Sequence, residues 1–164
     1  MILRKTAVTP IVLIFAITVI VNFLYCQSSK KIAAADVEKA VQARLDEIQS
    51  AAQGLDPDKV FSFVLDNDQG ALVRNGQLFL TREEALESTR QGFQGLQKIT
   101  YQFDKQYITL LSPTVALAVS EGLSSANTED GRTFTRRFAQ SVILVLKDSE
   151  WKVFHSHQST APGI

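Results

Sequence analysis

The feature that most constrains this chain is a change of hydrophobic period at Ile99, beyond which apolar and polar side chains alternate. Alternation with a period of two is typical of β-strands, because successive side chains point to opposite faces of a sheet. Short turn sequences interrupt the alternation at Ser112-Pro113, Asp130-Gly131 and Asp148-Ser149. The pattern therefore predicts an antiparallel meander of four long strands joined by short turns, over residues 99–111, 114–123, 133–147 and 151–159.

Two helices are predicted ahead of the strands. Apolar residues recur at helical spacing from Val37 to Ala52, and Gly54 ends that helix. The sequence Asp56-Pro57-Asp58 is typical of a helix start, since Asp56 can act as the N-cap and Pro57 fits the first helical position. The second helix is short, because a polar, glycine-containing stretch follows at residues 66–70.

A hairpin and a third helix complete the predicted elements. Asn75-Gly76 stands between two short apolar runs and is the dipeptide that best suits a two-residue hairpin turn. Thr81 and Glu84 have the spacing of a capping box, which marks the start of a helix. We therefore expect a third helix from this point to about Gly92 or Gly95.

Both faces of the predicted meander are apolar. Val142 and Leu144 face one way, while Ile143 and Val145 face the other. An antiparallel sheet with one face in water should alternate apolar with polar residues. Three helices can cover one face, so the other face needs a partner, most simply a second copy on a two-fold axis. The sequence therefore predicts a homodimer.

Residues 1–35 predict an export signal or a membrane anchor. The basic pair Arg4-Lys5 precedes an apolar run from Ile11 to Tyr25, and the first acidic residue is Asp36. This order is typical of a secretory signal or a signal anchor. With its flanks, the apolar segment 7–26 reaches a length that can span a membrane. We therefore expect the folded domain to be exported, or held at the cell membrane on its extracytoplasmic side.

Three fates of this segment stay open: retention as an anchor, cleavage after Ala33-Ala34-Ala35, or lipidation at Cys26. Lipidation is the bacterial lipoprotein pattern, but Tyr25 stands where a small residue is expected. A buried core helix is the remaining alternative, and the lack of a polar face argues against it. Residues 36–160 then form the folded domain, and residues 161–164 a short tail.

Several classes of function lack the residues they need. The chain has 17 basic and 17 acidic side chains without a basic block, which argues against nucleic acid as a partner. A single cysteine, Cys26, excludes an intramolecular disulfide and cysteine-based metal frameworks. His155 and His157 lie two residues apart, but no third ligand accompanies them. No phosphate-binding loop or nucleophile elbow occurs. We therefore expect neither a metal site nor a cofactor.

The order of elements, the Asn75-Gly76 turn ahead of Thr81-Arg82-Glu83-Glu84, and the closing stretch from Asp148 to Ser159 resemble one known family. They are similar to the SnoaL-like group of the nuclear transport factor 2-like superfamily, over about residues 36–160. The resemblance implies an α+β fold: a cone-shaped, strongly bent antiparallel sheet packed on three helices, with a pocket between them. Because this fold hosts isomerases, cyclases, dehydratases, binding proteins and oligomerisation modules, it implies no single activity.

The last strand carries the first candidate site residues. By alternation, Trp151, Val153, His155 and His157 share one face. If that face lines the pocket, Trp151 contributes to its wall and the two histidines approach its rim. Histidine titrates near neutral pH, so His157 is a candidate acid or base and His155 a candidate ligand-binding residue. The alternative is that His157 is a hydrogen-bonded structural residue.

Three further candidates come from the other elements. Glu121 follows apolar residues on one strand face, where burial would raise its pKa and suit it to act as a base. Alternatively it reaches solvent, or pairs with Arg136 or Arg137. Tyr101 offers a phenol donor to a ligand carbonyl, and Phe61 offers an apolar wall. Both aromatic residues would suit a closed core equally well.

These features predict a domain that binds a small, largely apolar molecule. One alternative is an isomerase or dehydratase that uses a pocket histidine or carboxylate as its base. Another is a dimerisation or scaffolding module without a pocket. Filling of the interior by bulky side chains would favour that module, and the candidates for filling are Phe61, Phe79, Tyr101 and Trp151.

Overall fold

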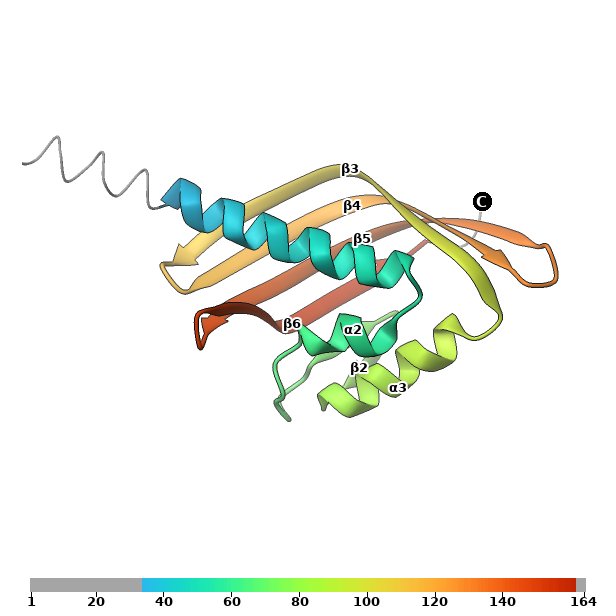
Figure 1. Ribbon diagram of the computed structural model, residues 1–164, viewed down its shortest axis with the longest axis horizontal. Coiled ribbons are helices and arrows are strands. Elements are labelled where there is room, and N and C mark those ends of the chain that lie inside the picture. The colour runs from blue at the N-terminus through green and yellow to red at the C-terminus, as the bar shows by residue number, and fades with distance from the viewer. Residues whose placement is uncertain (1–33, 162–164) are drawn as a thin grey trace, which may run out of the picture. The chain divides into compact units, whose positions relative to one another are not determined.

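One mixed sheet of six strands organises the fold in the computed structural model, which describes residues 34–161. Across the sheet the strands follow the order β2-β1-β6-β5-β4-β3 (Figure 1). Strands β1 and β6 run parallel, and the other neighbouring strands run antiparallel. The expectation of a wholly antiparallel sheet is therefore corrected at this one pair. The strand bounds are β1 Leu72–Arg74, β2 Gln77–Phe79, β3 Leu96–Ser112, β4 Val115–Thr128, β5 Thr133–Lys147 and β6 Glu150–Thr160.

The predicted meander is confirmed as the consecutive antiparallel strands β3, β4, β5 and β6. Two of its strands are longer than the alternation predicts, because β3 begins at Leu96 and β4 continues to Thr128. In the added part of β4 the side chains are mostly polar, and the hydroxyls of Ser125 and Thr135 lie 3.0 Å apart across the ladder. Such a stretch has no apolar period, so the sequence does not reveal it.

The three predicted helices are confirmed. The chain is helical from residue 34, where the description starts, to residue 53. Helix α2, Pro57–Ser62, begins where the backbone N–H of Lys59 donates to the side chain of Asp56. Helix α3, Arg82–Phe93, begins with a complete capping box between Thr81 and Glu84. Each start thus satisfies backbone donors that a helix leaves unpaired.

The β1–β2 hairpin turns at Asn75-Gly76, as predicted, and both residues have positive φ, 50° and 84°. Glycine adopts this conformation without steric cost and asparagine tolerates it. The Asn75 side-chain oxygen also accepts hydrogen bonds from the backbone N–H and the hydroxyl of Thr160, at 3.0 and 3.1 Å. The turn therefore joins the hairpin to the end of β6.

A register shift in β6 changes which side chains face the helices. Ile143 of β5 pairs with His155, but the next residue, Leu144, pairs with Val153. Phe154 is thus an extra residue, a β-bulge, and the alternation changes phase there. Val153 and Ser156 are buried on the inner face, which we define as the face that the helices cover. The predicted common face of Trp151, Val153, His155 and His157 is therefore wrong beyond Val153.

The inner face is close-packed at its centre. Val41 and Leu45 of the 34–53 helix pack on Ala116, Ala118 and Leu144. Small alanine side chains let a helix approach the sheet, and Val41, Ala116 and Leu144 are fully buried. Figure 1 shows the helix lying along β3 to β6, with α2 and α3 beside the hairpin. A second cluster joins α2, α3 and the hairpin, and contains Phe61, Ala71, Leu72, Phe79, Ala85 and Leu86.

The outer face of the sheet, opposite the helices, is also rich in apolar side chains. Val115, Leu117 and Ile143 are half-buried there. Val119 and Tyr107 are exposed, with 42% and 64% of their surface accessible. The predicted apolar character of both faces is therefore confirmed.

The predicted export signal or anchor, residues 1–35, lies almost wholly outside the described residues. No helix within the described part of the chain combines the length and apolar character needed to cross a membrane. Contacts divide the chain into two units, Met1–Asp36 and Val37–Ile164, and the fold described above is that of the second unit.

Candidate functional site

A cavity of about 350 Å³ lies between the helices and the inner face of the sheet. The cavity lies beside the close-packed centre, between α2, α3 and the strands. Most of its wall is apolar. The interior is therefore not filled by the bulky side chains that a pocketless module requires. The main apolar wall residues are Phe61, Leu72, Phe93, Ile99, Phe103 and Phe138.

Aromatic side chains of β3 and β5 form one wall of the cavity. The Phe138 ring lies edge-on to the rings of Tyr101 and Phe103, with centroid distances of 6.0 and 5.4 Å. These arrangements are the favourable ones for aromatic pairs. Gly122 lies between the strands that carry them, paired with both Phe103 and Phe138. A Cβ at Gly122 would overlap the carbonyl oxygen of Gln102, so β3 and β4 can approach only with glycine there.

A line of polar side chains crosses the sheet beneath the cavity. Arg74 pairs with Gln158, Gln158 with Gln140, Gln140 with Ser120, and Ser120 with Gln106. We call these five residues the polar row. Residues that pair directly across strands share a face, with side chains close enough to interact. All but Ser120 line the cavity, and Ser120 is buried.

The polar row was not predicted from the sequence. Gln140 lies on the same strand face as the apolar residues Phe138 and Val142. A polar residue at such an inward position could have indicated the row. For Gln158 the signal was hidden by the bulge, which reverses the phase of β6 after Val153. Arg74 ends a strand of only three residues, too short for a period to assign its face.

Arg74 is half-buried at the edge of the cavity. Its guanidinium lies 5.6 Å from the centre of the Phe79 ring, and it donates hydrogen bonds to the carbonyl and hydroxyl oxygens of Ser88. Burial lowers the pKa of Arg74 below its ordinary value, against a smaller opposing effect of Tyr101. No carboxylate within residues 34–161 forms an ion pair with it.

Two of the predicted ligand-binding residues, Tyr101 and Phe61, line the cavity. Burial raises the pKa of the Tyr101 phenol, although the nearby Arg74 charge acts in the opposite direction. The phenol therefore stays protonated at neutral pH and can donate a hydrogen bond. Trp151, a third predicted ligand-binding residue, instead packs in the core with Val41 and Leu144.

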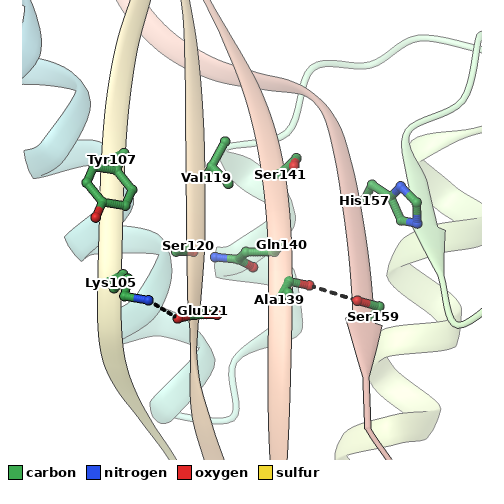
Figure 2. Close-up of a pocket in the computed structure, with 10 residues that line it drawn as sticks. All are labelled: Lys105, Tyr107, Val119, Ser120, Glu121, Ala139, Gln140, Ser141, His157 and Ser159. Atoms are coloured by element: carbon green, nitrogen blue, oxygen red, sulfur yellow. Dashed lines mark hydrogen bonds and ion pairs between the residues drawn. The ribbon is translucent and has the colours of Figure 1, made fainter.

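The two histidines lie away from the cavity. The ring nitrogen Nδ1 of His155 is 2.7 Å from the carbonyl oxygen of Gly70, to which it donates. This contact ties β6 to the segment before β1. His157 is exposed on the outer face and lines a shallow depression there, which we call the outer hollow (Figure 2). Neither ring is among the cavity-lining groups, because the bulge turns both to the other side of the sheet.

Glu121 also lines the outer hollow. Its carboxylate accepts a hydrogen bond from Lys105 Nζ at 2.8 Å, and its side chain is 42% exposed (Figure 2). The hydrogen bond and the charge of Lys105 lower the pKa of Glu121 below its ordinary value. The expected rise in pKa through burial is therefore wrong. The carboxylate has an ion-pair partner, which is Lys105 rather than Arg136 or Arg137.

The described part of the cavity lining contains no aspartate, glutamate or histidine, and Arg74 is its cation. Within the described residues, no group of three or more histidine, cysteine, aspartate or glutamate side chains could hold a metal ion. Tyrosine, arginine, serine and glutamine side chains can bind and orient a ligand by hydrogen bonds and charge. The arrangement is that of a mostly apolar binding cavity with a polar line across one wall.

Comparison with known structures shows the same fold in proteins of low sequence identity. A candidate scytalone dehydratase from Novosphingobium aromaticivorans matches with a TM-score of 0.73 and 11% identity, over 82% of this chain and 90% of that one. A candidate dehydratase of the NTF2-like family from Streptomyces avermitilis matches with a TM-score of 0.68 and 14% identity, over 77% and 97%.

An NTF2-like superfamily protein from Salmonella enterica serovar Typhimurium matches with a TM-score of 0.71 and 14% identity, over 79% of this chain and 94% of that one. No curated protein matches the chain by sequence. The SnoaL-like domain family, in contrast, matches the sequence over residues 41–162. The chain therefore belongs to the SnoaL-like domain family of the nuclear transport factor 2-like superfamily.

Proposed function

We propose that this domain binds a small, largely apolar molecule in the cavity between the sheet and the helices. The observation that carries the proposal is the cavity of about 350 Å³ with its aromatic and aliphatic wall. Binding sites for small molecules are typically concave, about 300–1,000 Å³ in volume, and mostly apolar with a few polar groups. The volume lies near the lower end of that range, which favours a compact ligand.

Binding accounts for the cavity better than proton transfer does. The isomerase or dehydratase alternative requires a histidine or carboxylate base beside the ligand. The two candidates for that base, His157 and Glu121, line the outer hollow instead. The described lining of the cavity contains no histidine, aspartate or glutamate. The names of the two dehydratase candidates among the structural matches describe those proteins, and their low identity supports only the shared fold.

A thermal-shift screen of compact apolar compounds tests the proposal. A ligand present at about 100 times its Kd should stabilise the folded domain by about 2.7 kcal/mol. A variant that blocks the cavity shows where binding occurs. Gly92 lines the cavity on the same stripe of α3 as the buried Ala85 and Thr89, and a Cβ there meets open space. The substitution Gly92→Leu should therefore fold normally and lose binding.

The matched control is Gln91→Leu, which adds the same side chain one residue earlier, on the exposed face of α3. It should bind as the unsubstituted protein does. A broad library without a single stabilising compound would contradict the proposed function, and equal binding by both variants would exclude the cavity as the site.

We propose further that the outer face pairs with a second copy of the chain. The support is its run of apolar side chains, with Val119 and Tyr107 exposed beside the half-buried Leu117 and Ile143. Apolar sheet faces of this kind are usually covered. Sedimentation velocity should report a dimer that Val119→Lys dissociates. A monomer at high micromolar concentration would contradict this proposal and leave the cavity proposal intact.

We propose that the domain works outside the cytoplasm, either exported or held at the membrane through residues 7–26. The support is the basic pair Arg4-Lys5 ahead of a long apolar run. Cell fractionation combined with mass spectrometry of the mature amino terminus tests this and separates the three fates. A full-length chain recovered from the cytoplasm would contradict it.

A further inference from the structure

Among the described residues, the cavity lining contains a positive charge without a negative one. Arg74 is the only lysine or arginine among its described lining residues, and none of those residues is acidic. The hydrogen-bond partners of Arg74 within the described chain are the carbonyl and hydroxyl oxygens of Ser88, both uncharged. A half-buried guanidinium usually has a carboxylate partner, because removing a charge from water is costly. Here the partner can come from a ligand.

The groups beside Arg74 are hydrogen-bond donors. Gln158 lies directly opposite Arg74 in the sheet, and Gln140 directly opposite Gln158. Both amides line the cavity, and their side chains form no hydrogen bond with any described residue. The Tyr101 phenol, kept protonated by burial, lies within electrostatic reach of Arg74. Guanidinium, amide and phenol groups together match an anionic oxygen, which accepts several hydrogen bonds.

One further group nearby has an unused hydrogen bond. The hydroxyl of Ser156 is buried, and it has no hydrogen-bond partner in the described part of the chain. Ser156 lines the cavity two residues from Gln158 and pairs with Leu72, two residues from Arg74. An unsatisfied buried hydroxyl costs free energy, so a native structure usually satisfies it through water or a ligand.

Apolar side chains flank the polar row on both sides. Residues two positions away along a strand form the neighbouring inward rows, except that a register shift in β3 puts Phe103 three positions from Gln106. One of these rows contains Leu72, Val142 and Ala118, and the other contains Phe138 and Phe103. A ligand with one polar end and an apolar body therefore meets complementary surfaces, with its polar end at Arg74 and its body against the aromatic wall.

We propose that the cavity selects an apolar monocarboxylate, whose carboxylate pairs with Arg74 while the Gln158 amide donates to it and the hydrocarbon body fills the apolar wall. This inference rests on the proposed binding function and names its ligand class. A single carboxylate matches the one cation among the described lining residues. A dianion would leave one charge unpaired in an apolar cavity, which is costly.

Matched probes that differ only at the polar end test this inference by isothermal titration calorimetry. The probes are octanoate with octanol, and naphthoate with naphthylmethanol. Each pair shares its apolar body, so the ratio of the two Kd values isolates the contribution of the charge. In the unsubstituted protein the carboxylate should bind about tenfold tighter or more, since hydrogen bonds to charged groups are the stronger ones.

Three variants assign the preference to one side chain. Arg74→Met removes the charge and keeps the length, and should abolish the carboxylate preference while the alcohols still bind. Arg74→Lys should restore part of it, because lysine keeps the charge without the bidentate geometry. Arg136→Met, a matched loss of an exposed arginine on β5, should leave the ratio unchanged.

The outcomes distinguish failure of the carboxylate inference from failure of the proposed binding function. Alcohols that bind as tightly as carboxylates would overturn the carboxylate inference and leave apolar binding in place. A lower melting temperature in Arg74→Met with an unchanged ratio would make Arg74 a structural residue and also overturn it. Failure of all four probes to bind would overturn the carboxylate inference, and the thermal-shift library would then decide the proposed function separately.

Discussion

The two faces of one sheet differ in what their polar side chains do. On the outer face Glu121 and Lys105 pair with each other, and His157 is exposed to solvent. On the inner face Arg74, Gln140 and Gln158 line an apolar cavity, in which no described residue is acidic. Polar groups that are already paired or solvated gain little free energy from a ligand. Unpaired polar groups in an apolar cavity gain more, because a ligand can supply the missing hydrogen bonds. The face with fewer ionisable groups is therefore the better candidate for binding.

The largest expected effect is the loss of packing on the inner face. Leu144→Ala should lower the free energy of unfolding by about 2–5 kcal/mol, because Leu144 is fully buried between the sheet and the 34–53 helix. Val119→Ala removes apolar surface from the outer face and should cost less than about 1 kcal/mol in the monomer. Urea unfolding of both variants checks the contrast, and equal losses would contradict it.

Gly122→Ala should have the next largest effect. The added methyl group would overlap the backbone of Gln102, so β3 and β4 must separate beside the aromatic wall, at a cost of about 1–3 kcal/mol. Gly92→Ala is the matched control, since its methyl group meets open space within a helix and should stabilise by about 0.4–1 kcal/mol. Thermal unfolding of the two variants should shift in opposite directions. Shifts of the same sign would contradict the close-approach argument.

Substitution of the two tyrosines of β3 compares the two faces by their effect on ligand affinity rather than on stability. Tyr101→Phe removes a phenol from the cavity and should weaken octanoate binding by about threefold to tenfold, the usual worth of one hydrogen bond. Tyr107→Phe removes a phenol from the outer hollow and should leave the affinity unchanged. Calorimetric titration of both variants distinguishes the faces. A weaker affinity in Tyr107→Phe alone would assign the ligand to the outer hollow.

The smallest expected effect is a pH dependence at Glu121. Its pKa in the folded state lies below the ordinary value of 4.5, because Lys105 favours the charged form. The stabilisation is therefore complete above that ordinary value and is lost as the pH falls through the lower folded-state value. Glu121→Gln should be slightly less stable at pH 7 and should match the unsubstituted protein in strong acid. Denaturant melts at both pH values test this, and a difference that grows in acid would reverse the sign.

The fold was largely predictable from sequence because its signals are local. Asp56-Pro57, Asn75-Gly76 and the Thr81–Glu84 capping box each determine a boundary through contacts within a few residues. The parallel pairing of β1 with β6 was not predictable, since it joins residues more than 80 positions apart. Strand β1 has only three residues, too few for a period that could indicate its neighbour.

The candidate site was predictable only in part. Tyr101 and Phe61 reach the cavity as expected, because the phase of β3 and the start of α2 follow from local patterns. The histidines were assigned to the wrong face, since one extra residue, Phe154, reverses the alternation, and no residue type marks a bulge. The same shift hid Gln158 and the register that aligns it with Arg74.

Asn75 ties the hairpin to the end of β6. Its backbone N–H donates to the carbonyl of Gln158, and its side chain accepts twice from Thr160, so the turn is tied to the last residues of β6. Strands β1 and β2 are the shortest in the sheet, but their buried side chains Leu72 and Phe79 pack in one cluster with Ala85 and Leu86 of α3. The position of Arg74 opposite Gln158 therefore depends on the side chain of Asn75 and on this cluster as well as on the short ladder.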